Sequence, residues 1–151
     1  MMKKTVIIIA VPILIILLSI IGLIIEKDSM IKKAKGENRE YEYYLNKEIY
    51  GTELTSIINK TVDKNEKNNI EKNQDGHYID NNKNSIKIEV KMLLTNKTYP
   101  MEEFYKNDMS RFIQNFNLTK FKCTSIEYHK STGKIKKLTF EEIEENIGIN
   151  F

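Results

Sequence analysis

The chain opens with a hydrophobic segment that no charged residue interrupts. From Thr5 to Ile25 the sequence holds 21 residues without a Lys, Arg, Asp or Glu. As an α-helix with a rise of ~1.5 Å per residue, this segment is about 31 Å long, close to the ~30 Å hydrocarbon thickness of a bilayer. Pro12 removes one backbone donor, which membrane helices tolerate. The pattern predicts a transmembrane helix over residues 5–25, behind a short tail at residues 1–4.

A cleaved secretion signal is the alternative interpretation of this segment. The apolar core of such a signal is about 7–15 residues long, and small residues follow it at the cleavage site. Here the run is longer and ends in IIGLIIEKD, with isoleucines in place of small residues. We therefore expect an uncleaved anchor rather than a secreted domain that is released by cleavage.

The basic residues on the two sides of the run bear on its orientation. Lys3 and Lys4 precede it, and five basic residues follow it: Lys27, Lys32, Lys33, Lys35 and Arg39. This count alone does not favour a cytoplasmic amino terminus. A short tail with lysines is nevertheless typical of a bacterial signal-anchor, and long downstream domains are translocated largely regardless of their charge. We expect the tail in the cytoplasm and the body outside the cell membrane; a cytoplasmic body is the alternative.

Two helical patterns follow the apolar run. Residues 26–50 predict a helical stalk in which Gly36 is a candidate helix end. Within the stalk, one-face helical spacing is shared by Tyr41, Tyr44, Leu45 and Ile49. The next segment begins at Gly51, and its apolar stripe consists of Leu54, Ile57, Ile58 and Val62. This stripe predicts an amphipathic helix of about four turns.

The pattern then changes between strand and helix. In SIKIEVKML, residues 85–93, apolar and charged side chains alternate, which predicts a half-buried strand. Together with HYID, residues 77–80, it predicts an antiparallel hairpin. Residues 99–116 return to helical spacing, with Pro100 in the first turn and one face made of Tyr105, Met109, Phe112 and Phe116. Residues 121–130 and 134–143 flank Gly133 and predict a second hairpin.

These elements predict an α+β fold. An N-terminal transmembrane helix and stalk lead into a small domain of helix–hairpin–helix–hairpin order, with an antiparallel sheet of about four strands and helices on one face. The predicted organisation is a cytoplasmic tail at 1–4, an anchor at 5–25, a stalk at 26–50 and a soluble domain at 51–151.

Charge and cysteine content narrow the classes of function. The chain has 24 basic and 21 acidic residues, and without Lys3 and Lys4 the body has 22 and 21. Nucleic-acid binders have a basic face for phosphate contacts, so we expect no nucleic-acid partner. Cys123 is the only cysteine, so no intramolecular disulfide can form. A hydrophobic core must therefore stabilise a body of roughly 100 residues.

Cys123 and His129 are the residue types of a nucleophile and its base. On one strand, six residues separate them by ~20 Å at ~3.3 Å per residue, whereas such a pair must approach within ~3 Å. A buried structural cysteine is the better interpretation. A small ligand-binding or enzymatic site on the sheet face near Cys123, Glu127 and His129 is an alternative hypothesis.

Two further patterns resemble metal sites. Glu127 and His129 share a strand face, but zinc sites need three or four ligands, and a polar, solvent-facing surface explains the pair. Residues 71–82 partly match a calcium loop, with Asn82 where a bidentate glutamate is required. An Asp-Gly turn explains that loop better. We expect no metal, no cofactor and no catalytic residue.

Four closely spaced tyrosines are a candidate contact surface, since tyrosine is favoured at protein interfaces. They are Tyr41, Tyr43, Tyr44 and Tyr50. Packing against the domain and a position at the membrane surface are the alternative interpretations.

Two resemblances bear on function. The stretches GTELTSIINKTVDKNEKN, YPMEEFYK and FKCTSIEYHK resemble uncharacterised single-span, membrane-anchored proteins of clostridial type; this resemblance implies no activity. The architecture, a hydrophobic N-terminal helix before a small helix-plus-sheet body, is similar to pilins and pseudopilins. Those proteins have a leader that ends in Gly and a Glu early in the apolar run, and this sequence has neither.

We therefore expect a membrane-anchored, non-enzymatic protein whose small extracytoplasmic domain is an interaction or structural component of the cell envelope. Its expected partners are the membrane, through residues 5–25, and a protein of the envelope; homo-oligomers are compatible with the sequence. A pilin-like assembly subunit is the close alternative, and a cytoplasmic regulatory module is a further one.

Overall fold

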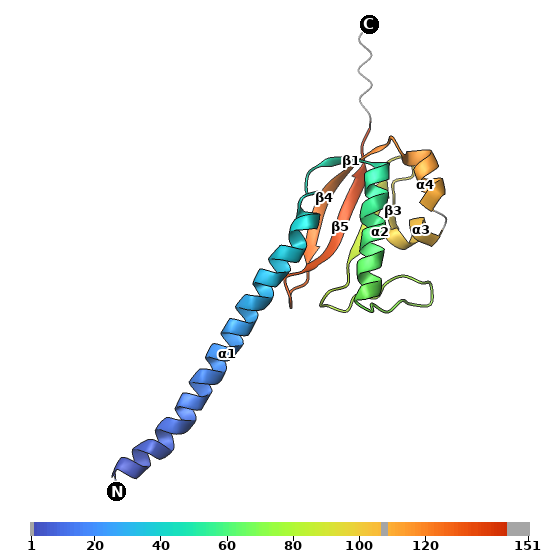
Figure 1. The fold of residues 1–151 in the computed structure, drawn as a ribbon. Helices are drawn as coiled ribbons and strands as arrows, with labels where there is room; N and C mark the ends of the chain where they lie inside the picture. The colour runs from blue at the N-terminus through green and yellow to red at the C-terminus, as the bar shows by residue number, and fades with distance from the viewer. Residues whose placement is uncertain (1, 107–108, 145–151) are drawn as a thin grey trace.

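A computed structural model describes residues 2–106 and 109–144 of the chain, with side chains from Val11 onward except that of Lys106. A single long helix leads into a small α+β domain, and the first part of this helix extends away from the domain (Figure 1). The elements, in chain order, are α1 (Met2–Glu42), β1 (Glu48–Tyr50), α2 (Gly51–Lys67), β2 (Lys87–Met92), β3 (Lys97–Pro100), α3 (Met101–Lys106), α4 (Met109–Phe116), β4 (Lys120–Tyr128) and β5 (Ile135–Glu142).

Five strands form one mixed sheet in the order β1-β4-β5-β2-β3. The pairs β1–β4, β4–β5 and β2–β3 are antiparallel, whereas β2 and β5 are parallel, with Ile88 opposite Leu138 and Val90 opposite Phe140. The α+β class and the hairpin of β4 and β5 are confirmed. The expectation of an antiparallel sheet of about four strands is wrong in strand number and in the direction of one pair.

The first predicted hairpin is also wrong, because its partner strand does not form. Residues 77–80 are not a strand, and β2 instead forms its hairpin with β3. Local side-chain bonds explain the failure: the Asn81 side-chain oxygen accepts backbone N–H bonds from residues 83, 84 and 85. An asparagine that binds nearby backbone in this way competes with strand pairing.

The core lies between α2 and one face of the sheet. The predicted stripe of α2 is confirmed, since all four of its apolar side chains are buried. In β2 the alternation is confirmed too, with Ile88, Val90 and Met92 buried between half-buried charged residues. The opposite sheet face therefore has charged side chains, and the domain has two layers. Gly51 is required where α2 begins, because a Cβ there would lie 1.9 Å from the Phe116 oxygen.

The helix expected over residues 99–116 begins later and is described as two helices. Pro100 is the last residue of edge strand β3, a position where its missing N–H is tolerated. α3 then starts at Met101, and α4 at Met109. Phe112 is buried and Phe116 is half-buried, whereas Tyr105 remains 53% exposed. The apolar face was therefore predicted in part.

The long helix differs from the predicted stalk at both proposed ends. α1 continues through Gly36 and ends at Glu42, so Leu45 and Ile49 do not lie on a helix. The chain turns at Asn46, whose φ is 62°, and Glu48–Tyr50 then pairs with β4. The side-chain spacing had predicted a helix here. Pairing with the edge of the sheet instead satisfies the backbone N–H and C=O groups of residues 48–50.

Candidate functional site

The first half of α1 presents aliphatic side chains that the domain does not cover. Every large one from Val11 to Ile25 is at least 48% exposed. The polar Ser19 hydroxyl donates within the helix to the Ile15 carbonyl at 2.9 Å. A helix that is hydrophobic all round is normally buried, either in a large core or in a membrane. Over the part of the chain that the structure describes, no helix meets the length and apolarity needed to cross a membrane.

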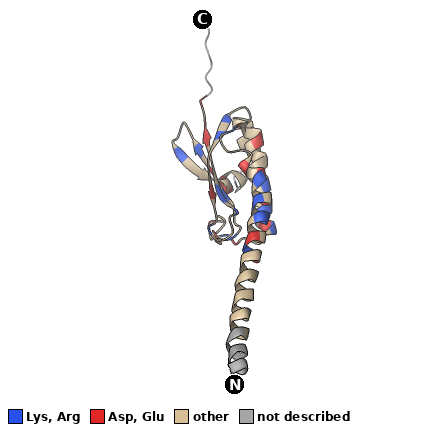
Figure 2. Cartoon of the chain, turned by 90° about the vertical axis from the view of Figure 1, so that its left-hand side faces the viewer, with Lys and Arg blue, Asp and Glu red and all other residues tan. Residues whose placement is uncertain are grey.

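Charged residues return immediately after this apolar segment. Figure 2 shows α1 without charged residues along its described lower part and with mixed charges higher up, where the domain begins. Asp28 and Lys32, one helical turn apart, form an ion pair of 2.9 Å between exposed side chains. The boundary between the two halves of α1 is therefore sharp in the sequence and in space.

The second half of α1 is fixed to the domain by Asn38. This side chain is 4% exposed, and its amide nitrogen donates to the Gly133 carbonyl at 2.8 Å while its oxygen accepts from the Ile135 N–H at 3.0 Å. Ala34 and Tyr41 are buried on the same helix face. One polar residue thus joins α1 to the β4–β5 turn. This role of Asn38 was not predicted from the sequence. The one-face helical spacing of Asn38 with Ala34 and Tyr41 is the signal that could have indicated it.

Further contacts join α1 to its neighbours. Lys134 and Glu37 form an ion pair of 2.8 Å, and the hydrogen bond from Lys134 is the main reason that the pKa of Glu37 is lowered. Glu40 forms an ion pair with Lys60 of α2. These exposed and half-exposed pairs add little stability each, but they are all on the part of α1 that contacts the domain.

The four tyrosines of the predicted contact surface do not share one environment. Tyr41 is buried, and its hydroxyl accepts a hydrogen bond from Thr61 at 3.2 Å. Tyr44 is half-buried, while Tyr43 and Tyr50 are 59% and 48% exposed. Lys47 lies 3.1 Å from the centre of the Tyr43 ring, a cation–π arrangement. Tyr41 belongs to the core; a contact role for the exposed pair stays a prediction.

Cys123, Glu127 and His129 each have separate partners. Cys123 is fully buried beside the Ser125 carbonyl, and burial raises the pKa of its thiol to about 11. Glu127 is exposed and pairs with Lys137 at 2.8 Å. The register shift between Cys123 and Ser125 explains why β4 loses its simple alternation there. The three side chains therefore do not form one constellation.

His129 is buried, so the expectation of a solvent-facing position is wrong for this residue. Its Nε2 lies 2.7 Å from the Ser85 carbonyl, which can only accept, and its Nδ1 lies 3.8 Å from Asp80. Asp80 also binds Lys136 at 2.6 Å. The pKa of Asp80 would rise through burial, but hydrogen bonds from Lys136 and the Asn82 N–H outweigh this and lower it to about 2. This cluster fixes the asparagine-rich loop to the β4–β5 turn.

The calcium-like loop is a local turn in the structure. The Asn73 side chain accepts the His77 N–H at 2.8 Å, and Gly76 has a φ of 81°. This side-chain-to-backbone bond closes the loop locally, four residues along the chain. Among the described residues, no group of three or more candidate ligands is placed to hold a metal ion.

Comparison of the chain with known protein families, with curated proteins and with solved structures finds no match. The candidate site is therefore assigned from the geometry of α1 and the domain alone.

Proposed function

We propose that the chain is a single-pass, membrane-anchored and non-enzymatic protein, in which residues 5–25 lie in the bilayer and the α+β domain contacts another component of the cell envelope. The support for this proposal is the uninterrupted α1. Its uncharged N-terminal segment has exposed aliphatic side chains wherever they are described, and the same helix is fixed to the domain through Asn38.

In this proposal the continuous helix also sets the height of the domain above the bilayer. Ala34, the first buried residue of the second half, lies nine positions after Ile25, which is about 14 Å along the helix at ~1.5 Å per residue. The headgroup layer beyond the hydrocarbon is about 5–8 Å thick. The domain is therefore held just above the headgroups by a continuous helix. A fixed height suits a protein that meets another membrane-bound component.

The anchor is tested by alkaline extraction of membranes, combined with the mass of the membrane-bound chain. Retention in the pellet at full-length mass is the expected result. A mass lower by about 2–3 kDa with release from the membrane would instead identify a cleaved signal. A reporter fused after the C-terminus gives the orientation: an outward reporter supports the envelope role, and an inward one replaces it with a cytoplasmic module.

The partner contact is proposed to involve Tyr43 and Tyr50, the two exposed members of the tyrosine set. A photo-crosslinking amino acid at each position is expected to join the same envelope protein, whereas one at exposed Lys67 of α2 is not. If both tyrosine positions give only the products that the Lys67 position also gives, this surface is not the contact.

A pilin-like assembly subunit is the second candidate, and one specific observation favours it. The first half of α1 projects away from the domain while the second half packs against it (Figure 1). The large aliphatic side chains described on the first half are all exposed. Cysteine in place of Leu18, in a Cys123→Ala background, is expected to give disulfide-linked copies in membranes if these helices assemble. If only monomers are found, the segment does not assemble, and its proposed role is that of a single membrane anchor.

A further inference from the structure

An aromatic cleft lies at the side of the domain where the β2–β3 turn faces α3 and α4. Its volume is about 340 Å³, which is the room of about eleven water molecules at ~30 Å³ each. Small-molecule sites commonly have volumes of about 300–1,000 Å³. The cleft is thus of the right size for a ligand of about a dozen non-hydrogen atoms.

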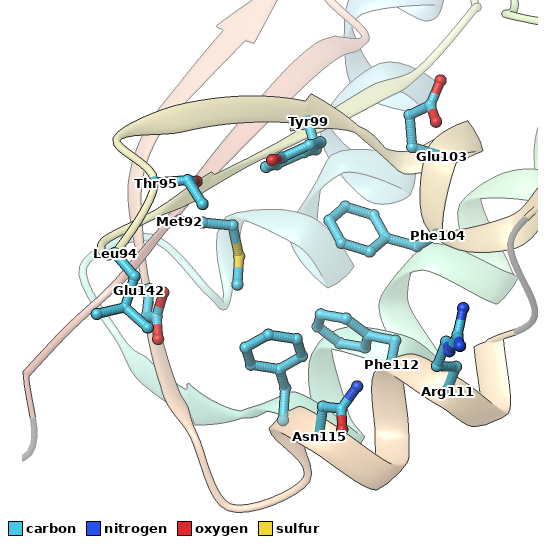
Figure 3. A pocket seen from close by; sticks show the side chains of 11 residues that line it. Met92, Leu94, Thr95, Tyr99, Glu103, Phe104, Arg111, Phe112, Asn115 and Glu142 are labelled. Carbon is cyan, nitrogen blue, oxygen red and sulfur yellow. The ribbon is translucent and has the colours of Figure 1, made fainter.

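The wall of the cleft is a continuous row of rings. The centres of Phe104 and Phe112 are 4.8 Å apart, and those of Phe112 and Phe116 are 5.1 Å apart. Tyr99 extends the row from β3 at 6.2 Å from Phe104, and Met92 lies opposite (Figure 3). Phe112 is buried, whereas the other three rings are only partly covered. The row therefore offers an apolar surface that the described protein leaves open.

Of the charged side chains around this wall, some have a polar partner in the described part of the domain and one does not. Glu142 accepts the Leu93 N–H at 2.8 Å, and Glu103 lies 3.3 Å from His77. Arg111 also lines the cleft, and it forms no ion pair or side-chain hydrogen bond among the residues that the structure describes. Its guanidinium is the one charged group of the lining without such a partner there.

Asn115 is a second polar side chain of the cleft that lies next to Arg111. It is four residues after Arg111 on α4, so both side chains lie on one helix face, beside Phe112 (Figure 3). Its amide likewise has no hydrogen bond among the described residues. A guanidinium and an amide side by side provide donors that fit a carboxylate.

We propose that this cleft binds a small amphipathic carboxylic acid, with its aromatic or aliphatic body against the row of rings and its carboxylate at Arg111 and Asn115. The inference does not depend on the proposed membrane function, because no residue of the anchor takes part.

The test uses the full chain in lipid nanodiscs and three soluble probes that share a phenyl ring on a four-carbon chain. 4-Phenylbutyrate has twelve non-hydrogen atoms and a carboxylate; 4-phenylbutyramide and 4-phenylbutylamine replace it with a neutral and a cationic group. Saturation-transfer NMR, with empty nanodiscs subtracted, gives the affinities. The carboxylate is expected to bind about tenfold or more tightly than the amide, as one charge-assisted contact provides, and the amine more weakly still.

Variants show whether the binding occurs at this cleft. Arg111→Gln is expected to remove the preference for the acid, while Lys67→Gln, the same charge change on exposed α2, leaves it intact. Asn115→Trp places a large side chain at an exposed position of the cleft and is expected to abolish binding of every probe, with an unchanged circular dichroism spectrum.

Several results would overturn the proposal. These are no binding of phenylbutyrate up to about 10 mM, equal affinity for acid and amide, or an acid preference that survives Arg111→Gln. Tighter binding of a blocked Phe-Asp dipeptide would assign the cleft to a polypeptide. A gain in affinity after removal of residues 145–151 would assign it to the chain itself, and a loss with rising protein concentration would assign it to a second copy.

Discussion

The two halves of α1 belong to one helix but bury their apolar side chains in different ways. Around the first half, aliphatic residues point in all directions and the domain covers none of those described. In the second half only one stripe, with Ala34, Asn38 and Tyr41, is buried, and most of the other residues are charged. The second half is therefore held by the domain, whereas the first half needs an apolar environment that the domain does not provide.

The largest effect is expected from charges in the first half. Leu17→Arg combined with Ile21→Arg places two guanidinium groups near the middle of the apolar run, where each costs about 2.5–3.5 kcal/mol in a bilayer. The variant is expected to leave the membrane pellet after alkaline extraction. Met30→Arg with Ile31→Arg adds the same charges beyond the run and should stay in the pellet. Equal retention of both variants would contradict a bilayer environment for the first half.

Removal of the Asn38 side chain tests the second half. Asn38→Ala leaves the Ile135 N–H and the Gly133 carbonyl without their partners. Buried unsatisfied groups cost about 1–3 kcal/mol each, so the loss of both partners is expected to lower the free energy of unfolding by about 2–6 kcal/mol. Labelling of buried Cys123 in urea measures the change, with Ser29→Ala as the exposed control on α1. A change below about 0.5 kcal/mol would show that Asn38 does not fix the helix.

Acid should lower the stability of the domain at Asp80, whose cluster holds the β4–β5 turn that α1 contacts. The pKa of Asp80 is lowered from its ordinary 3.8 to about 2 in the folded protein. Its contribution is therefore present above pH 4 and lost as the pH falls from about 4 to about 2, a change of about 2 kcal/mol. Urea unfolding followed by tyrosine fluorescence measures it. Asp80→Asn should be less stable at neutral pH and lose less in this window, whereas exposed Asp63→Asn should behave as the unsubstituted chain does.

The smallest effect is expected at the ion pair between Glu37 and Lys134. Because the pKa of Glu37 is lowered, its contribution is present above its ordinary pKa and lost as the pH falls below it. Both side chains are about 30% exposed, so Glu37→Gln should cost at most about 1 kcal/mol. The cost should shrink in high salt. A salt-independent loss above about 2 kcal/mol would show that the pair does more than a surface ion pair.

Local patterns were sufficient for the parts of the fold that depend on one face of one element. The stripe of α2, the alternation in β2 and the turn at Gly133 between β4 and β5 are examples. The parallel pairing of β2 with β5 was not predictable, because it depends on the meeting of strands far apart in the sequence. Side-chain bonds such as those of Asn81 also lie outside a hydrophobic pattern.

The candidate sites likewise divide into features that a local sequence pattern predicted and features that it did not. The apolar run was visible as an uncharged segment, and the burial of Cys123 followed from its residue type. Neither the role of Asn38 nor the cleft beside Arg111 was predicted. Both require residues from separate elements to come together: Asn38 meets the β4–β5 turn, and the cleft lies between the β2–β3 turn and two helices.

Thiol labelling along α1 tests the central claim most directly. In a Cys123→Ala background, single cysteines replace Leu17, Leu23, Lys32 and Ala34, and membranes are treated with a water-soluble maleimide. We expect Leu17→Cys and Leu23→Cys to react only after detergent, Lys32→Cys to react at once, and Ala34→Cys to react only after denaturant, because lipid shields the first pair and the domain shields Ala34. Immediate labelling at Leu17 and Leu23 would contradict the account.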